Sequence, residues 1–167
     1  MMGLAFAFTR PLGEMALNDD WLYARMVRDL DLSTFKPDTF IVSVFVGQWG
    51  YAKILTFLFG FHLTLLRLST FFLAVIAILC LYRMVVFRLG VRMSLIICLG
   101  LLFHPLFYHL SLSFMTDIPA FVCILLGLIF YWYWWESPRL SLWWLAQFLT
   151  LYGSFIRQNY FVFFAAS

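Results

Sequence analysis

Long runs without charged residues make up most of the chain after residue 63. No Asp, Glu, Lys or Arg interrupts residues 68–82, 93–116, 118–135 or 140–156. About 20 helical residues cross a hydrocarbon core of about 30 Å, so each run with its flanks suits a membrane span. The alternation typical of spanning strands is absent, so the pattern predicts an all-α, polytopic transmembrane helical bundle. The expected spanning helices cover residues 64–87, 92–111, 117–135 and 141–163.

The chain before residue 63 has a different pattern. Residues 1–12 begin with an apolar run too short to span, and we interpret them as the remnant of a first helix. The stretch 39–61 is apolar but contains Lys53. It could be a fifth span, or a helix lying in the interface with the lysine reaching the headgroups. Apolar sequence at both ends predicts a truncated chain, the N-terminal fragment of a longer protein, which could be inactive alone.

The composition excludes an ordinary soluble domain. Of the 167 residues, 65% are hydrophobic and 11% are charged, and the mean hydropathy is +0.95. A soluble domain has about 45–50% apolar and about 25% charged residues. The net charge of +3 is too small to indicate a nucleic-acid partner. The three cysteines lie inside apolar runs and are interpreted as small buried side chains rather than disulfides.

The few charges are sorted between the predicted loops. Arg83, Arg88 and Arg92 surround the first loop between spans and Arg139 lies in a later one, so the positive-inside rule makes these loops cytoplasmic. This topology holds only if 39–61 does not cross, so we expect residues 13–63 to form an outer loop with interfacial helices. The outer face then receives seven of the eight acidic residues: Glu14, Asp19, Asp20, Asp29, Asp31, Asp38 and Asp117.

Asp19 and Asp20 form the first candidate site. They lie side by side at the predicted membrane face, with the aromatic Trp21 and Tyr23 close by in sequence. Two carboxylates in partly dehydrated surroundings suit a general base and could hold a divalent cation. Alternatively, this pair caps the helix that follows it and interacts favourably with its dipole.

Asp117 forms the second candidate site, as a single acid between two long apolar runs. An acid at a membrane boundary is a functional candidate, because such a charge is costly there. It also suits a helix start, with Thr116 or Asp117 as the N-cap and Pro119 in the first turn. Both interpretations are compatible, and the topology predicts that Asp117 shares its face with Asp19 and Asp20.

Arg157 and Gln158 form the third candidate site. Arg157 lies roughly 24 Å along a helix from Ser141, in the outer third of the bilayer. A guanidinium there could bind a lipid phosphate through two hydrogen bonds. It could equally reach the outer headgroups, or pair with a carboxylate of another helix.

These elements, in this order, resemble bacterial membrane glycosyltransferases of the protein O-mannosyltransferase and aminoarabinose transferase group. This group, which includes glycosyltransferase family 39, uses polyprenyl-phosphate sugars and has the GT-C fold. The resemblance implies a GT-C-like N-terminal module with interfacial helices in the first outer loop. The similar segments are residues 18–24, 66–70, 104–107, 114–119 and 157–158.

The resemblance also implies roles for individual residues. Asp19 matches the candidate base or metal-binding carboxylate, with Tyr23 in support, and Asp20 stands where relatives often have Glu. Asp117 matches a second acid that helps to bind a cation or the acceptor, so Asp19 and Asp117 could share a divalent metal ion. Arg157 and Gln158 match a contact to the donor phosphate.

The expected function is therefore the transfer of a sugar from a polyprenyl-phosphate donor to a lipid, protein or glycan acceptor. The resemblance implies a multi-pass protein of the bacterial inner membrane, in contact with membrane lipid, with its site facing outward. One alternative is a non-catalytic polytopic protein such as a transporter or flippase half, in which buried charges line a pathway. Another is an inactive, truncated reading frame.

Overall fold

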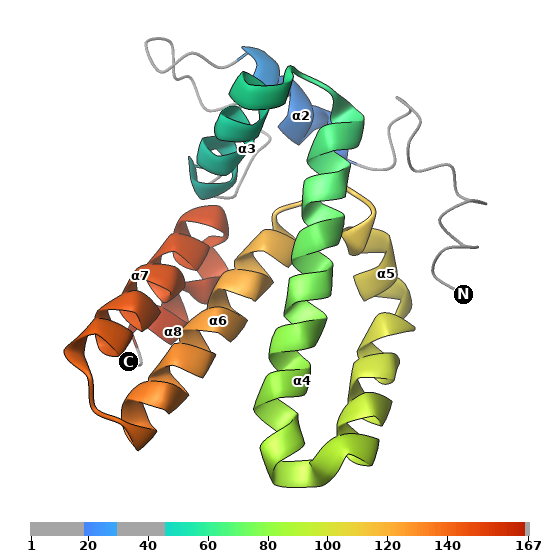
Figure 1. Cartoon of the computed structure of the whole chain (residues 1–167). Helices are drawn as coiled ribbons and strands as arrows, with labels where there is room; N and C mark the ends of the chain where they lie inside the picture. The colour runs from blue at the N-terminus through green and yellow to red at the C-terminus, as the bar shows by residue number, and fades with distance from the viewer. Residues whose placement is uncertain (1–18, 30–45, 166–167) are drawn as a thin grey trace.

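The structure, a computed structural model, describes residues 19–29 and 46–165 and contains only helices in these ranges (Figure 1). The expected all-α class is thus confirmed. The expected helix remnant over 1–12, and residues 13–18 and 30–45 of the expected outer loop, lie outside the described residues. The elements are α2 (Asp20–Asp29), α3 (Val46–Phe59), α4 (Leu63–Leu102), α5 (Pro105–Ser111), α6 (Asp117–Glu136), α7 (Leu140–Ile156), η2 (Gln158–Tyr160) and α8 (Phe161–Ala165).

Helix α4 consists of two limbs joined at Gly90. This residue has φ 72° and ψ 170°, a backbone conformation that is essentially restricted to glycine. The chain reverses there, so residues 63–89 and 91–102 run side by side in opposite directions (Figure 1). The Cys98 thiol donates a weak hydrogen bond to the carbonyl of Ile78 at 3.8 Å. The loop expected between 87 and 92 is therefore a tight turn centred on one residue.

Two of the expected spanning helices are shorter than the sequence suggested. The helix expected over 92–111 is interrupted after Leu102, and α5 begins at Pro105. Proline lacks an N–H and disfavours helical backbone in the residue before it, and His104 is accordingly extended. The helix expected over 141–163 ends at Ile156, because Arg157 is extended with φ −147° and ψ 113°.

Among the described residues, two helices are long and apolar enough to cross a membrane, namely Leu63–Leu102, which includes the turn at Gly90, and Asp117–Glu136. Leu140–Ile156 is a shorter apolar helix. Large apolar side chains such as Phe72 and Ile96 lie exposed on α4, as suits a surface in contact with lipid. Helix α3 has 14 residues and is therefore about 21 Å long, less than the hydrocarbon core. Residues 39–45 lie outside the described residues, so the interfacial and spanning alternatives for the stretch 39–61 both stay predictions.

Helices α6 and α7 pack closely through small residues. A Cβ atom at Gly127 would lie 2.6 Å from Cγ2 of Thr150, and one at Gly153 would lie 3.2 Å from Cβ of Cys123. Small residues let helix backbones approach in this way, and such contacts are typical of helices packed within membranes. This packing brings the start of α6 beside the end of α7.

The bundle has two chemically different ends. Helices α2 and α3 lie at the top of Figure 1, above the start of α6 and the end of α7, and we call this part of the bundle the aspartate end. The turn at Gly90 and the connection between α6 and α7 lie at the opposite end, which we call the arginine end. Asp20 and Asp117 belong to the first end. Four arginines lie near the second: Arg83, Arg88, Arg92 and Arg139.

Candidate functional site

Asp19 and Asp20, although adjacent in sequence, have different environments. Asp20 is the first residue of α2 and is fully buried, whereas Asp19 lies just before the helix and is exposed. The carbonyl of Asp19 accepts a hydrogen bond from the N–H of Leu22 at 3.0 Å, which fixes the first turn of α2. The pair expected from the sequence therefore divides into one buried and one accessible carboxylate.

The buried carboxylate of Asp20 is paired with Arg67, in the second turn of α4. Both Nε and Nη2 of Arg67 lie 2.8 Å from Oδ2 of Asp20, and Arg67 is only 3% exposed. The two residues are 47 positions apart, so this contact ties α2 to α4. Around them is an apolar cluster formed by Ala24, Met26, Val27, Ala52, Leu63, Leu66 and Phe114.

The second carboxylate, Asp117, is paired with Arg157. Asp117 is the first residue of α6, where the positive end of the helix dipole favours a negative charge. Arg157 follows α7, and its Nη1 donates to Oδ1 of Asp117. The side chains are 27% and 35% exposed, respectively, so this pair is open to a ligand in a way that the Asp20–Arg67 pair is not. Of the three alternatives for Arg157, the structure shows pairing with a carboxylate of another helix.

The N-cap interpretation of the second site is only partly correct. Thr116 occupies the N-cap position of α6, but its side chain makes no capping hydrogen bond. The N–H of Ala120 bonds to the Thr116 carbonyl at 3.2 Å, as in an ordinary first turn. The Asp117 carboxylate is consequently held by Arg157 rather than committed to the helix backbone.

Helix α3 connects the two ion pairs. The Tyr152 hydroxyl of α7 donates to the Gly47 carbonyl at 2.7 Å, and a Cβ atom at Gly47 would lie 2.7 Å from Cγ1 of Ile156. One turn further along α3, the Tyr51 ring packs edge-on against Phe114, with 6.4 Å between centroids. Since Phe114 also belongs to the cluster around Asp20, α3 fixes both pairs at the aspartate end.

A buried amide on α3 was missed by the sequence reasoning. Gln48 is fully buried, and neither atom of its amide has a hydrogen-bond partner among the described residues. Burying an unpaired amide costs free energy, so Gln48 marks a buried polar position on α3. Arg67 was also missed as a partner, although a lone arginine at the start of an apolar span calls for a nearby carboxylate.

The remaining predicted site residues lie around the two pairs. Tyr23 is half-buried and packs against the apolar cluster that encloses Asp20. Gln158 is exposed and follows Arg157 directly, in η2. Asp29, at the far end of α2, is exposed, and the Arg28 guanidinium that donates to it holds its pKa below its usual range.

The expected metal ion at Asp19 and Asp117 stays a prediction. Asp20 and Asp117 each face a guanidinium, which neutralises the carboxylate and repels a metal ion. Within residues 19–29 and 46–165, no group of three or more His, Cys, Asp or Glu side chains could hold a metal ion. No step proposed below passes through a metal.

Comparison with known proteins identifies the family. Residues 43–167 match the family described as dolichyl-phosphate-mannose-protein mannosyltransferase. The chain belongs to this family. In general terms, it is related to membrane glycosyltransferases of the mannosyltransferase type, in agreement with its apolar helices. Searches of curated proteins and of solved structures found no match.

The family match covers the two candidate sites unequally. It includes Arg67, Asp117 and Arg157, together with all of α3 to α8 up to residue 165. Asp19 and Asp20 lie before the matched residues. The mannosyltransferase relationship therefore bears directly on the Asp117–Arg157 pair, and it reaches α2 through the contact between Asp20 and Arg67.

Proposed function

We propose that the chain takes part in transferring a sugar from a polyprenyl-phosphate donor to an acceptor hydroxyl at the aspartate end of the bundle. Family membership supports the donor class, since the family description names a lipid-phosphate sugar. The observation that carries the proposal is the accessible Asp117–Arg157 pair, which offers a guanidinium beside a carboxylate at a helix start. Such a guanidinium suits recognition of a phosphate.

In this proposal Asp19 acts as the general base. Its side chain is exposed at the start of α2, so an acceptor hydroxyl can reach it. Asp19 takes the hydroxyl proton as the acceptor oxygen attacks the anomeric carbon, and the bond from that carbon to the phosphate oxygen breaks. Inversion at the anomeric carbon follows from this single displacement. Asp20 is a positioning residue, since its pairing with Arg67 fixes the first turn of α2 and hence Asp19.

Arg157 is the proposed partner of the leaving phosphate. Negative charge develops on that phosphate as the glycosidic bond breaks, and a fixed guanidinium stabilises this charge. Asp117 holds the guanidinium in place before the donor arrives. Gln158 is exposed beside Arg157 and could donate its amide to a second phosphate oxygen, and Tyr23 supports the site by packing against the apolar cluster at this end.

The arginine end is the proposed cytoplasmic end of the chain. Arg83, Arg88, Arg92 and Arg139 near that end satisfy the positive-inside rule, which leaves the aspartate end on the outer face. We therefore propose an inner-membrane protein of a bacterium, with its site facing outward. The acceptor is then a lipid, protein or glycan hydroxyl on the outer side.

Replacing Asp19 tests the proposed base. Asp19→Asn should lower sugar transfer by about 10²-fold or more, because general-base catalysis typically contributes 10²–10⁴-fold. Asp29→Asn is the matched control, since Asp29 is an exposed aspartate of the same helix region and lies at its far end. Transfer is measured in proteoliposomes of the full-length protein, with a radiolabelled polyprenyl-phosphate sugar. Equal rates for the two variants would rule out Asp19 as the base.

Replacing Arg157 tests the proposed phosphate contact. Arg157→Gln should raise KM for the donor and lower kcat, because the guanidinium binds the phosphate before and during its departure. Arg157→Lys should recover part of the donor binding but less of the rate, because lysine lacks the planar fork. Arg139→Gln removes an exposed arginine at the opposite end and should leave both constants unchanged. An Arg157→Gln enzyme with unchanged constants would contradict this role.

A further inference from the structure

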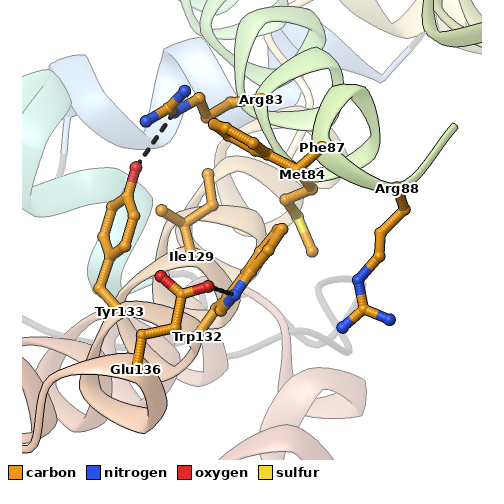
Figure 2. A pocket seen from close by; sticks show the side chains of 8 residues that line it. All are labelled: Arg83, Met84, Phe87, Arg88, Ile129, Trp132, Tyr133 and Glu136. Carbon is orange, nitrogen blue, oxygen red and sulfur yellow. Dashed lines mark hydrogen bonds between the residues drawn. The ribbon is translucent and has the colours of Figure 1, made fainter. Parts of the chain in front are cut away.

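A pocket lies at the arginine end of the bundle, away from both ion pairs. Its volume is about 430 Å³. Figure 2 shows the side chains that line it, from the lower part of α4 and the end of α6. Helix α4 contributes Arg83, Met84, Phe87 and Arg88, and α6 contributes Ile129, Trp132, Tyr133 and Glu136. The hollow continues past Arg88 toward Trp135 in an adjoining pocket of about 470 Å³. This region combines cations, aromatic rings and aliphatic walls.

The two arginines of this pocket are held by neutral groups. Nε of Arg83 donates to the Tyr133 hydroxyl at 3.1 Å, and its guanidinium lies 4.4 Å from the centroid of the Phe87 ring. The guanidinium of Arg88 lies 5.9 Å from the Trp132 ring centroid. In the part of the chain that the structure describes, neither arginine takes part in an ion pair. Stacking on rings fixes a guanidinium while leaving its terminal N–H groups available to an anion.

The carboxylate in the pocket, that of Glu136, is hydrogen-bonded to a tryptophan. Oε1 of Glu136 accepts a hydrogen bond from Nε1 of Trp132 at 2.6 Å, and Figure 2 shows this carboxylate turned toward the indole. Two arginines and one glutamate leave one net positive charge in the pocket. That charge matches a phosphodiester, which carries a single negative charge, and an arginine can bind a phosphate through two parallel hydrogen bonds.

The surroundings indicate where such a phosphodiester comes from. Trp132, Tyr133 and Trp135 form the aromatic band typical of the membrane–water interface, where lipid headgroups lie. Met84 and Ile129 continue the wall toward the apolar surface of the bundle, as acyl chains require. Basic pockets between spanning helices bind anionic headgroups in this manner.

We propose that this pocket binds the headgroup of an anionic phospholipid, with Arg83 and Arg88 as the two cations that line it. The bound lipid joins α4 to α6 at the arginine end, since each helix supplies one side of the pocket. The site is independent of the proposed sugar transfer, which takes place at the other end of the bundle. Phosphatidylglycerol, a phosphodiester with one negative charge, is the suitable probe.

The test compares lipid retention by native mass spectrometry. Full-length protein in detergent is mixed with phosphatidylglycerol and phosphatidylcholine of equal chain length. The wild type should retain phosphatidylglycerol with a preference of about tenfold or more, the scale of one or two charge-assisted hydrogen bonds. The double variant Arg83→Gln/Arg88→Gln should lose this preference. Arg92→Gln/Arg139→Gln removes the same charge from the same end, outside the pocket, and should keep it.

Two further measurements keep the result interpretable. Glu136→Gln retains both arginines and can still accept from Trp132, so it should raise the preference for phosphatidylglycerol. Inorganic phosphate at millimolar concentration should not displace the lipid, because it lacks the acyl chains that contact Met84 and Ile129. Equal loss of preference in both double variants would overturn the proposal, since it would show attraction to general surface charge. Displacement of the lipid by inorganic phosphate would overturn the lipid as the ligand and indicate a soluble phosphate.

Discussion

At the scale of single residues, the Asp20–Arg67 pair is the most deeply buried ion pair among the described residues. Asp20 is 0% exposed and Arg67 is 3% exposed, so both charges have left water. Removing an ion from water costs several kcal/mol. Attraction to a close ion of opposite charge offsets this cost only while both ions are present. The stability of the aspartate end therefore depends on the two residues together.

Removing one partner should expose this dependence. Arg67→Met should lower the free energy of unfolding by about 3–5 kcal/mol, because the Asp20 carboxylate stays buried without its cation. The double variant Asp20→Asn/Arg67→Met should recover much of this loss. Unfolding in detergent micelles, followed by circular dichroism, measures the difference, with Arg92→Met as the control at an exposed arginine. A single variant as stable as that control would show that the pair contributes little.

Single residues also show how much of the site could be predicted from the sequence. The sequence indicates Asp19, Asp20, Asp117 and Arg157 by their scarcity among apolar residues. It does not indicate that Asp20 is enclosed while Asp19 is open, because the packing of α2 on distant segments decides which of the two is covered. The partner of each carboxylate lies 47 or 40 residues away, so local pattern could not identify it.

At the scale of elements, backbone chemistry sets where the helices end. The arginines around residues 83–92 predicted a loop, and the structure has a turn at Gly90 within that stretch. Pro105 was included in an expected continuous helix, whereas its ring and missing N–H interrupt that helix. The hydropathy pattern did not reveal the break at Pro105, because the segments before and after it are both largely apolar.

The turn can be tested with two glycines of the same helix. Gly90→Ala should lower the free energy of unfolding by about 1–3 kcal/mol, because a side chain disfavours this backbone conformation. A Cβ atom at Gly90 meets nothing within 4 Å, so the effect is conformational and not steric crowding. Gly100→Ala is the matched control, because its surroundings are equally open and its backbone is helical. Alanine there should be neutral or stabilise by up to about 1 kcal/mol.

If the two alanine variants unfolded alike, the turn at Gly90 would not depend on glycine. The measurement is again unfolding in micelles, with the helix content checked before each series. A rise in stability for both variants would indicate that residues 63–102 form one continuous helix in solution.

At the scale of the whole molecule, charge is divided between two ends. Figure 1 places the elements that carry Asp20 and Asp117 together, opposite the turn at Gly90 and the 137–139 connection. From the sequence, the positive-inside rule alone predicted that these acids share one face of the membrane. The structure adds that α3 bridges the two ion pairs, through Gly47 on one side and Tyr51 on the other.

Cysteine labelling tests the orientation of these ends. In a variant with Cys80, Cys98 and Cys123 replaced by alanine, Asp19→Cys should react with an impermeant maleimide added outside intact cells. Ser137→Cys should react only after the membrane is permeabilised, because its loop lies on the cytoplasmic side in the proposed topology. Both positions are exposed, so lack of reaction does not reflect burial. Labelling of both from the same side would contradict the orientation.

The sequence by itself determined the all-α class, the membrane setting, and the aspartates and Arg157 as candidate site residues. It could do so because apolar run length and the scarcity of charge are local properties of the chain. Only the tertiary structure decided that Arg67 belongs to Asp20 and Arg157 to Asp117, and that Arg83 and Arg88 share a pocket with Trp132. These are contacts between distant segments, and they arise from the packing of helices whose mutual orientation no single segment encodes.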